Sequence, residues 1–133
     1  MYLSSLGERE KQLFLELVRH TMLLDCEVSS SEVQALDSYI HECALPHHRP
    51  LGLPISQVID ELANSSYRVK ITILLELWSL IYCDISTRDK EEVFMLDIAN
   101  KWAISEAQVR RYKRWAKDFI DIITDGQRLI NDN

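Results

Sequence analysis

Apolar residues recur every three or four positions along most of the 133-residue chain, and this spacing constrains the fold more than any other feature. It is the spacing of one face of an α-helix, whereas a half-buried strand alternates at every second position. No segment keeps up a two-residue alternation. The chain also has only three glycines and three prolines, and all the prolines fall between positions 46 and 54. We therefore expect an all-α fold.

The apolar spacing predicts about six to seven helices. The segment from Tyr67 to Tyr82 is apolar almost all round, which predicts a central buried helix. The other five stripes are Phe14, Leu17, Val18 and Met22; Val33, Leu36, Ile40 and Cys43; Ile55, Val58, Ile59 and Leu62; Met95, Ile98, Ala99 and Trp102; and Val109, Tyr112, Ala116, Phe119, Ile120 and Ile123. With no marked shift in composition, residues 1–133 are expected to form one helical domain.

Capping signals support the predicted helix ends. Three serines stand three residues before Glu or Gln, as in a capping box: Ser5 with Glu8, Ser29 with Glu32, and Ser105 with Gln108. Gly126 is expected to end the sixth helix, with a short seventh turn after it. The stretch "ALPHHRPLGLP", residues 44–54, is expected to be the one long loop.

The composition restricts the function. The net charge of −6 disfavours a general nucleic-acid binder. The longest apolar stretch, residues 71–83, is interrupted by Glu76 and is too short to span a bilayer. Three cysteines give no disulfide framework, and the first residues lack the pattern of a secretory signal, so we expect a reduced, cytoplasmic protein.

One acidic spacing occurs twice. Asp25 and Glu32 are seven positions apart, as are Asp84 and Glu91, and each pair is flanked by apolar helical stripes. When Asp25 is placed on Asp84, the neighbouring apolar positions also match. Two helices joined by a short acidic loop form an αα-hairpin, so we expect a bundle built around two related αα-hairpins.

Each acid has a structural and a ligand-binding interpretation. Glu32 and Glu91 lie where a helix is expected to begin, and a negative charge there is stabilising by ~0.3–1 kcal/mol. Asp25 and Asp84 follow a helix, and an Asx turn would explain them. The alternative is that all four carboxylates bind a hard divalent cation such as Ca²⁺, Mg²⁺ or Mn²⁺. The sequence of an EF-hand loop is absent from both copies.

The doubled acidic hairpin, and above all "LIYCDISTRDKEEVFMLDIANKWAIS" (residues 80–105), resembles the tellurite-resistance TerB-like family. The resemblance covers about residues 8–124. It implies a compact helical bundle, a role in tellurite or other stress resistance, and an acidic divalent-metal site. On this resemblance, Asp25, Glu32, Asp84 and Glu91 would be metal ligands, with Glu27 and Asp89 as further candidates. The chain departs from the family pattern at Cys26 and Ile85, where the family has glycine.

Two other residue groups are candidate sites. "HECALPHH", residues 41–48, contains potential zinc ligands, but Cys43 falls on an apolar stripe and is better explained as core. "RRYKRWAK", residues 110–117, is either the solvated face of the sixth helix or a docking surface for an acidic partner, a nucleic acid or an anionic lipid.

Three functions are compatible with these features of the sequence. The first is a non-enzymatic TerB-like stress-response protein that binds a divalent cation. The second is a ligand-free protein–protein interaction module that uses the basic sixth helix or an apolar groove. The third, a metal-assisted enzyme, is disfavoured because no nucleophile-and-base pattern or glycine-rich phosphate loop is present.

Overall fold

The computed structural model describes residues 2–24, 30–44, 50–83 and 89–132. Over these ranges the chain folds into six α-helices and one short 3-10 helix, with no strand. The all-α helical bundle is therefore confirmed. In chain order the elements are η1 (Leu3–Ser5), α1 (Glu8–Leu23), α2 (Ser30–Glu42), α3 (Ile55–Leu62), α4 (Tyr67–Cys83), α5 (Asp89–Lys101) and α6 (Glu106–Asn131).

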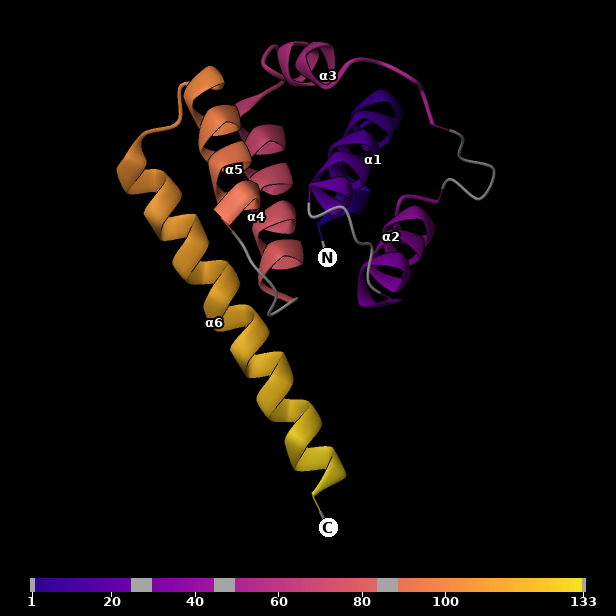
Figure 1. Ribbon diagram of the computed structural model, residues 1–133, viewed down its shortest axis with the longest axis vertical. Helices are drawn as coiled ribbons and strands as arrows, with labels where there is room; N and C mark the ends of the chain where they lie inside the picture. Colours follow the sequence, from indigo (N-terminus) through magenta and orange to yellow (C-terminus); the bar gives the residue numbers. More distant parts are fainter. Residues whose placement is uncertain (1, 25–29, 45–49, 84–88, 133) are drawn as a thin grey trace.

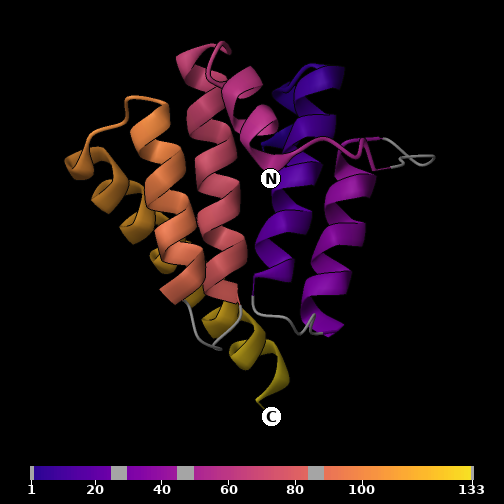
Figure 2. The same cartoon turned by 45° about the horizontal axis from the view of Figure 1, so that its top comes forward.

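Four helices stand side by side in the order α5, α4, α1 and α2, and α3 lies across one end of them (Figures 1 and 2). Helix α6 packs along α4 and then continues beyond the bundle, so that the C-terminal end lies far from the other helices (Figure 1). The predicted equivalence of the two hairpins stays a prediction, because loop residues 25–29 and 84–88 lie outside the described ranges. A single domain over residues 1–133 also stays a prediction.

The core lies where the apolar stripes of the helices meet. As predicted, α4 contributes on several sides, and Trp78 is almost completely buried. The other fully buried large side chains are Phe14, Leu3, Leu13, Leu15, Leu17, Leu62, Ile73, Leu74, Leu77, Met95 and Ile98. Helix spacing thus identified most of the core correctly.

Several details differ from the sequence-based expectations. Val33 is 47% exposed, so the second stripe begins at Leu36, and Tyr67 at the start of α4 is exposed. The first capping box is wrong, because α1 begins after Gly7, whose N–H donates to Glu10 Oε1 at 2.9 Å. Ser5 lies in η1 instead. Of the other boxes, Ser29 lies outside the described residues, and the Ser105–Gln108 box is confirmed.

Gly126 does not end the sixth helix, since α6 continues to Asn131. A glycine ends a helix when it adopts positive φ, and in helical geometry it costs only about 1 kcal/mol relative to alanine. There is consequently no separate seventh helix, and α6 is one helix of 26 residues, about 39 Å long.

The direction of α6 is set by a tight corner after α5. Ala103 adopts a φ of 58°, and the N–H of Ile104 donates to the carbonyl of Ala99 at 2.8 Å, as in a Schellman motif. Trp102 is buried, and its Nε1 donates to the Ile59 carbonyl at 2.9 Å. The corner is therefore held against α3, and Ser105 caps the new helix immediately after it.

Candidate functional site

The described residues contain only one of the four predicted metal ligands in full. Glu91 lies in the first turn of α5 and is 8% exposed. Asp25 and Asp84, as well as Glu27, lie outside the described residues, as does the side chain of Glu32. Among the described residues, no group of three or more His, Cys, Asp or Glu side chains is placed to hold a metal ion. Binding of a cation by the four acids therefore stays a prediction.

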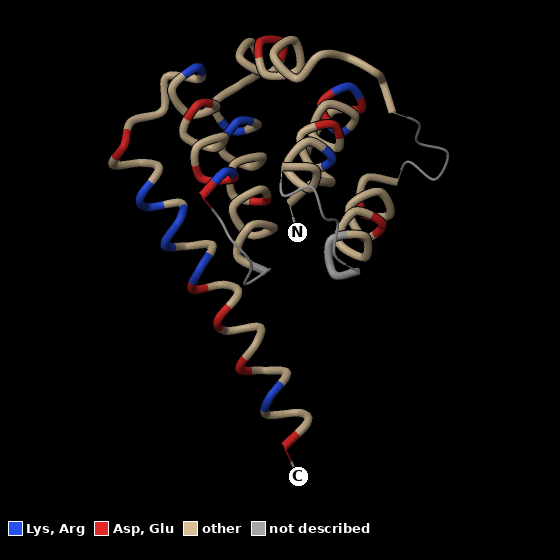
Figure 3. The backbone as a smooth tube through the Cα atoms, viewed as in Figure 1, with Lys and Arg blue, Asp and Glu red and all other residues tan. Residues whose placement is uncertain are grey.

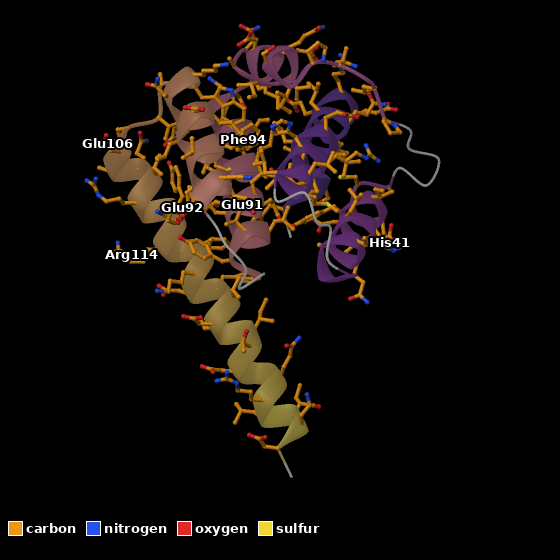
Figure 4. The ribbon with its side chains drawn as sticks, in the orientation of Figure 1. His41, Glu91, Glu92, Phe94, Glu106 and Arg114 are labelled. Carbon is orange, nitrogen blue, oxygen red and sulfur yellow. The ribbon has the colours of Figure 1, made fainter. Side chains whose placement is uncertain are left out.

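The three acids in the first turn of α5 differ in their exposure. Asp89 is exposed, Glu92 reaches Lys113 Nζ of α6 at 3.6 Å, and Glu91 is buried (Figure 4). A negative charge in a first helical turn is stabilised by the helix dipole. The capping interpretation thus accounts for the position of Glu91 in the chain, although dipole stabilisation does not require burial.

Cys43 and His41, two of the potential zinc ligands, differ in their exposure. Cys43 is buried, and this burial raises the pKa of its thiol to about 11, so it is protonated at neutral pH. His41 is exposed, and His47 and His48 lie outside the described residues. Cys43 thus belongs to the core, as expected.

The basic cluster lies on the first half of α6, which we call the basic half (residues 106–117). Arg110, Arg111 and Arg114 are exposed and line a shallow concavity. Lys113 also lines this concavity, and its Nζ lies over the ring of Trp78, 5.2 Å from the ring centroid. The basic half therefore presents its arginines to solvent, while Lys113 ties it to the bundle.

Hydroxyl groups join the basic half to the start of α4. The hydroxyls of Tyr67 and Tyr112 are 2.9 Å apart, and Gln108 Nε2 donates to Tyr67 Oη at 2.7 Å. Burial and the bond to Tyr67 raise the pKa of Tyr112 to about 12. These contacts fix the helix at its N-terminal end.

An open concavity of about 550 Å³ lies beside the basic half. It is lined mostly by apolar surface from η1 and α4, including Ile71, Leu75 and the rings of Tyr2 and Tyr67. Tyr67 contacts Tyr112 as described, and the Tyr2 ring centroid is 6.2 Å from that of Trp115. We call this feature the η1–α4 concavity. The sequence alone does not locate an apolar groove of this kind, because its walls come from segments far apart in the chain.

Two glutamates, of which Glu76 is buried and Glu42 is partly buried, bind the N-terminal segment that forms one wall of this concavity. The N–H of Tyr2 donates to Glu76 Oε1 at 2.7 Å, and the N–H of Leu3 donates to Glu42 Oε2 at 2.9 Å. Leu3 is itself fully buried. The sequence carried one signal of this arrangement, since Glu76 interrupts the apolar run of α4.

The second half of α6, which we call the distal half (residues 118–131), extends beyond the bundle (Figure 1). Ile122 is 70% exposed, Leu129 is 79% exposed and Ile130 is 81% exposed. These exposed apolar side chains on one helix make the distal half a candidate interaction surface.

Comparison of the chain with protein-family models, curated proteins and solved structures yields no match. The resemblance to the TerB-like family thus stays a prediction. None of the helices in the described part of the chain combines the length and apolar character that crossing a bilayer requires.

Proposed function

We propose that this chain is a non-enzymatic, cytoplasmic protein–protein interaction module whose binding element is helix α6. The single observation that carries the proposal is the exposure of Ile122, Leu129 and Ile130 on the distal half. Burial of one such side chain contributes roughly 1.5–3 kcal/mol, so a partner covering all three would gain substantial affinity.

The basic half supplies the second component of this surface. Its exposed arginines favour an acidic partner and speed encounter with it. The bundle itself then serves to hold α6 near its N-terminal end through the Tyr67–Tyr112 contact and the Lys113–Glu92 ion pair.

The test is quantitative capture of partner proteins from a cell extract on the immobilised chain. Charge reversal of Arg110, Arg111 and Arg114 to Glu should reduce the captured amount several-fold, while chelator should not. A matched variant reverses Lys90 and Lys101, which are exposed on α5, and should capture as the parent does. Equal capture by all three chains would refute a role for the basic half.

A second candidate is the TerB-like stress-response function, with a divalent cation at Asp25, Glu32, Asp84 and Glu91. Its support is the low exposure of Glu91 at the start of α5, immediately after the second acidic loop. Burying a carboxylate is costly unless a positive charge or hydrogen bonds compensate it, and a bound cation is one such compensation. Its test is the cation dependence of thermal unfolding, given in the Discussion.

A further inference from the structure

The apolar residues of α6 follow the period of a coiled-coil seam into the distal half. Trp115, Phe119, Ile122 and Leu129 occupy four of five positions spaced alternately by four and three residues, and the remaining position is Gly126, which has no side chain. This is the a/d spacing of a heptad repeat, in which each side chain packs against a facing helix. The rings of Trp115 and Phe119 stack at 5.4 Å beside the bundle, whereas Ile122 and Leu129 are exposed. The partner expected for the distal half is therefore another helix.

The charges along α6 indicate which helix this is. The basic half carries five Lys or Arg residues between positions 110 and 117 and one acid, Glu106 (Figure 3). The distal half carries Asp118, Asp121 and Asp125 and one cation within residues 118–131, Arg128, which lies 3.7 Å from Asp125. Two copies of α6 in parallel would place cations against cations. Two antiparallel copies would place the acids of each distal half against the arginines of the other basic half, which is favourable.

The space for such a helix lies beside the basic half. The η1–α4 concavity is apolar and adjoins α6 at Tyr112 and Trp115. An apolar distal half laid antiparallel beside α6 would cover it. Because each copy offers both a distal half and a concavity, the same contact is made twice about one two-fold axis and the assembly closes as a dimer.

We propose that this chain forms a two-fold symmetric dimer in which each distal half of α6 docks antiparallel beside the basic half of α6 in the second copy, over its η1–α4 concavity. The dimer proposal rests on the proposed function, because α6 is the binding element in both. It identifies the partner of α6 as a second copy of the chain.

The first experiment is sedimentation velocity of the purified full chain over a range of concentrations and at low and high salt. We expect a monomer–dimer equilibrium that shifts toward monomer at high salt, because screening weakens the contacts between the aspartates and arginines. A chain that is monomeric at every concentration and salt would overturn the proposal.

The apolar seam is tested by the double variant Ile122→Asp, Leu129→Asp. Since both side chains are largely exposed in the single chain, the helical content should stay that of the parent while the dimer Kd rises more than about tenfold. The matched control is Val93→Asp, Leu96→Asp, an exposed apolar pair on α5. Equal weakening by both variants would contradict a seam on α6.

The antiparallel arrangement is tested by two sets of charge substitutions, alone and combined. Either Arg110→Asp, Arg111→Asp, Arg114→Asp or Asp118→Lys, Asp121→Lys, Asp125→Lys alone should give a monomer, since the net charges of the two halves then have one sign. A chain with all six substitutions should form homodimers again and should not pair with the parent, because an antiparallel mixed dimer would place like charges together. Mixed dimers with the parent would overturn the arrangement, since only a parallel pair favours them.

Failure of this proposal and failure of the proposed function are distinguishable. Sedimentation uses the purified chain alone, whereas capture measures proteins from an extract. A monomeric chain that still captures a partner through its arginines overturns the dimer and leaves the interaction function intact. A dimer that captures nothing supports the self-assembly and argues against a foreign partner.

Discussion

The indole Nε1 of Trp102 donates a hydrogen bond of 2.9 Å to the backbone carbonyl of Ile59, and so joins the end of α5 to α3. Both residues are buried, and the bond fixes the position from which α6 departs. The same carbonyl also accepts the backbone N–H of Ala63 at 3.0 Å, so the indole supplies the second of its two hydrogen bonds.

Replacement of Trp102 by Phe should lower the free energy of unfolding. Loss of the indole donor removes one of the two hydrogen bonds that the Ile59 carbonyl accepts, at about 0.5–1.5 kcal/mol, and the smaller ring adds the cost of a cavity. Urea unfolding monitored by circular dichroism measures the change. Trp115→Phe, at a half-buried position, is the control and should cost less. Equal costs would mean that the hydrogen bond contributes nothing to stability.

Ala103→Gly should raise the free energy of unfolding by about 1 kcal/mol. Ala103 is held at a φ of 58°, a conformation that costs an L-residue with a Cβ roughly 1–2 kcal/mol but is open to glycine. Ala107→Gly is the control with the opposite expected sign, because Ala107 lies in the first turn of α6 in ordinary helical geometry. Destabilisation by both substitutions would show that Ala103 is not strained.

Stability should fall as the pH drops through the range where histidine titrates. Burial against α5 lowers the pKa of His20 below its ordinary value of 6.5, and its ring lies 4.6 Å from that of Phe94. The unfolded chain then takes up a proton that the folded chain excludes, so stability is full above the unfolded pKa and is lost as the pH falls below it.

The pH effect is measured by urea unfolding from about pH 8 to about pH 5, the range in which histidine titrates. His20→Gln should flatten the profile, because glutamine does not titrate. His41→Gln, at an exposed position, is the control and should leave the slope as it is. A parent profile that is flat over this range would contradict the proton exclusion.

Thermal unfolding with and without Ca²⁺, Mg²⁺ and Mn²⁺ tests the cation hypothesis. A ligand at 100 times its Kd stabilises the native state by about 2.7 kcal/mol, which raises Tm by roughly 5–15 °C for a domain of this size. Asp84→Asn should abolish the shift, and Asp97→Asn, an exposed acid on α5, should retain it. No shift with any cation would leave the repeated acids as caps and turns.

The sequence predicted the helices and most of the core because helix periodicity is local and strong. Phe14 and Leu17 on α1 and Met95 and Ile98 on α5 are buried as their spacing indicates. Gly126 was misassigned because glycine can end a helix or lie within one, and the choice depends on a backbone angle that the sequence does not state.

The candidate surface was harder to predict, because burial depends on what lies opposite a stripe. Tyr112 and Ile123 belong to one stripe, yet only Tyr112 lies against α4, while Ile123 is on the part of α6 that extends beyond the bundle. The η1–α4 concavity brings Tyr2 to residues of α4 some 70 positions away, and the main sequence signal of that contact was the lone Glu76 in an apolar helix.

The stacking of Trp115 on Phe119 gives the chain an optical reporter. Trp78 and Trp102 are buried in the core, whereas Trp115 is half-buried at the border between the bundle and the distal half of α6. A helix docked beside α6 would remove water from this indole and leave the other two in their present surroundings. The emission of Trp115, isolated by replacing the two core tryptophans in a chain shown to remain folded, would thus report in real time whether the surface is covered.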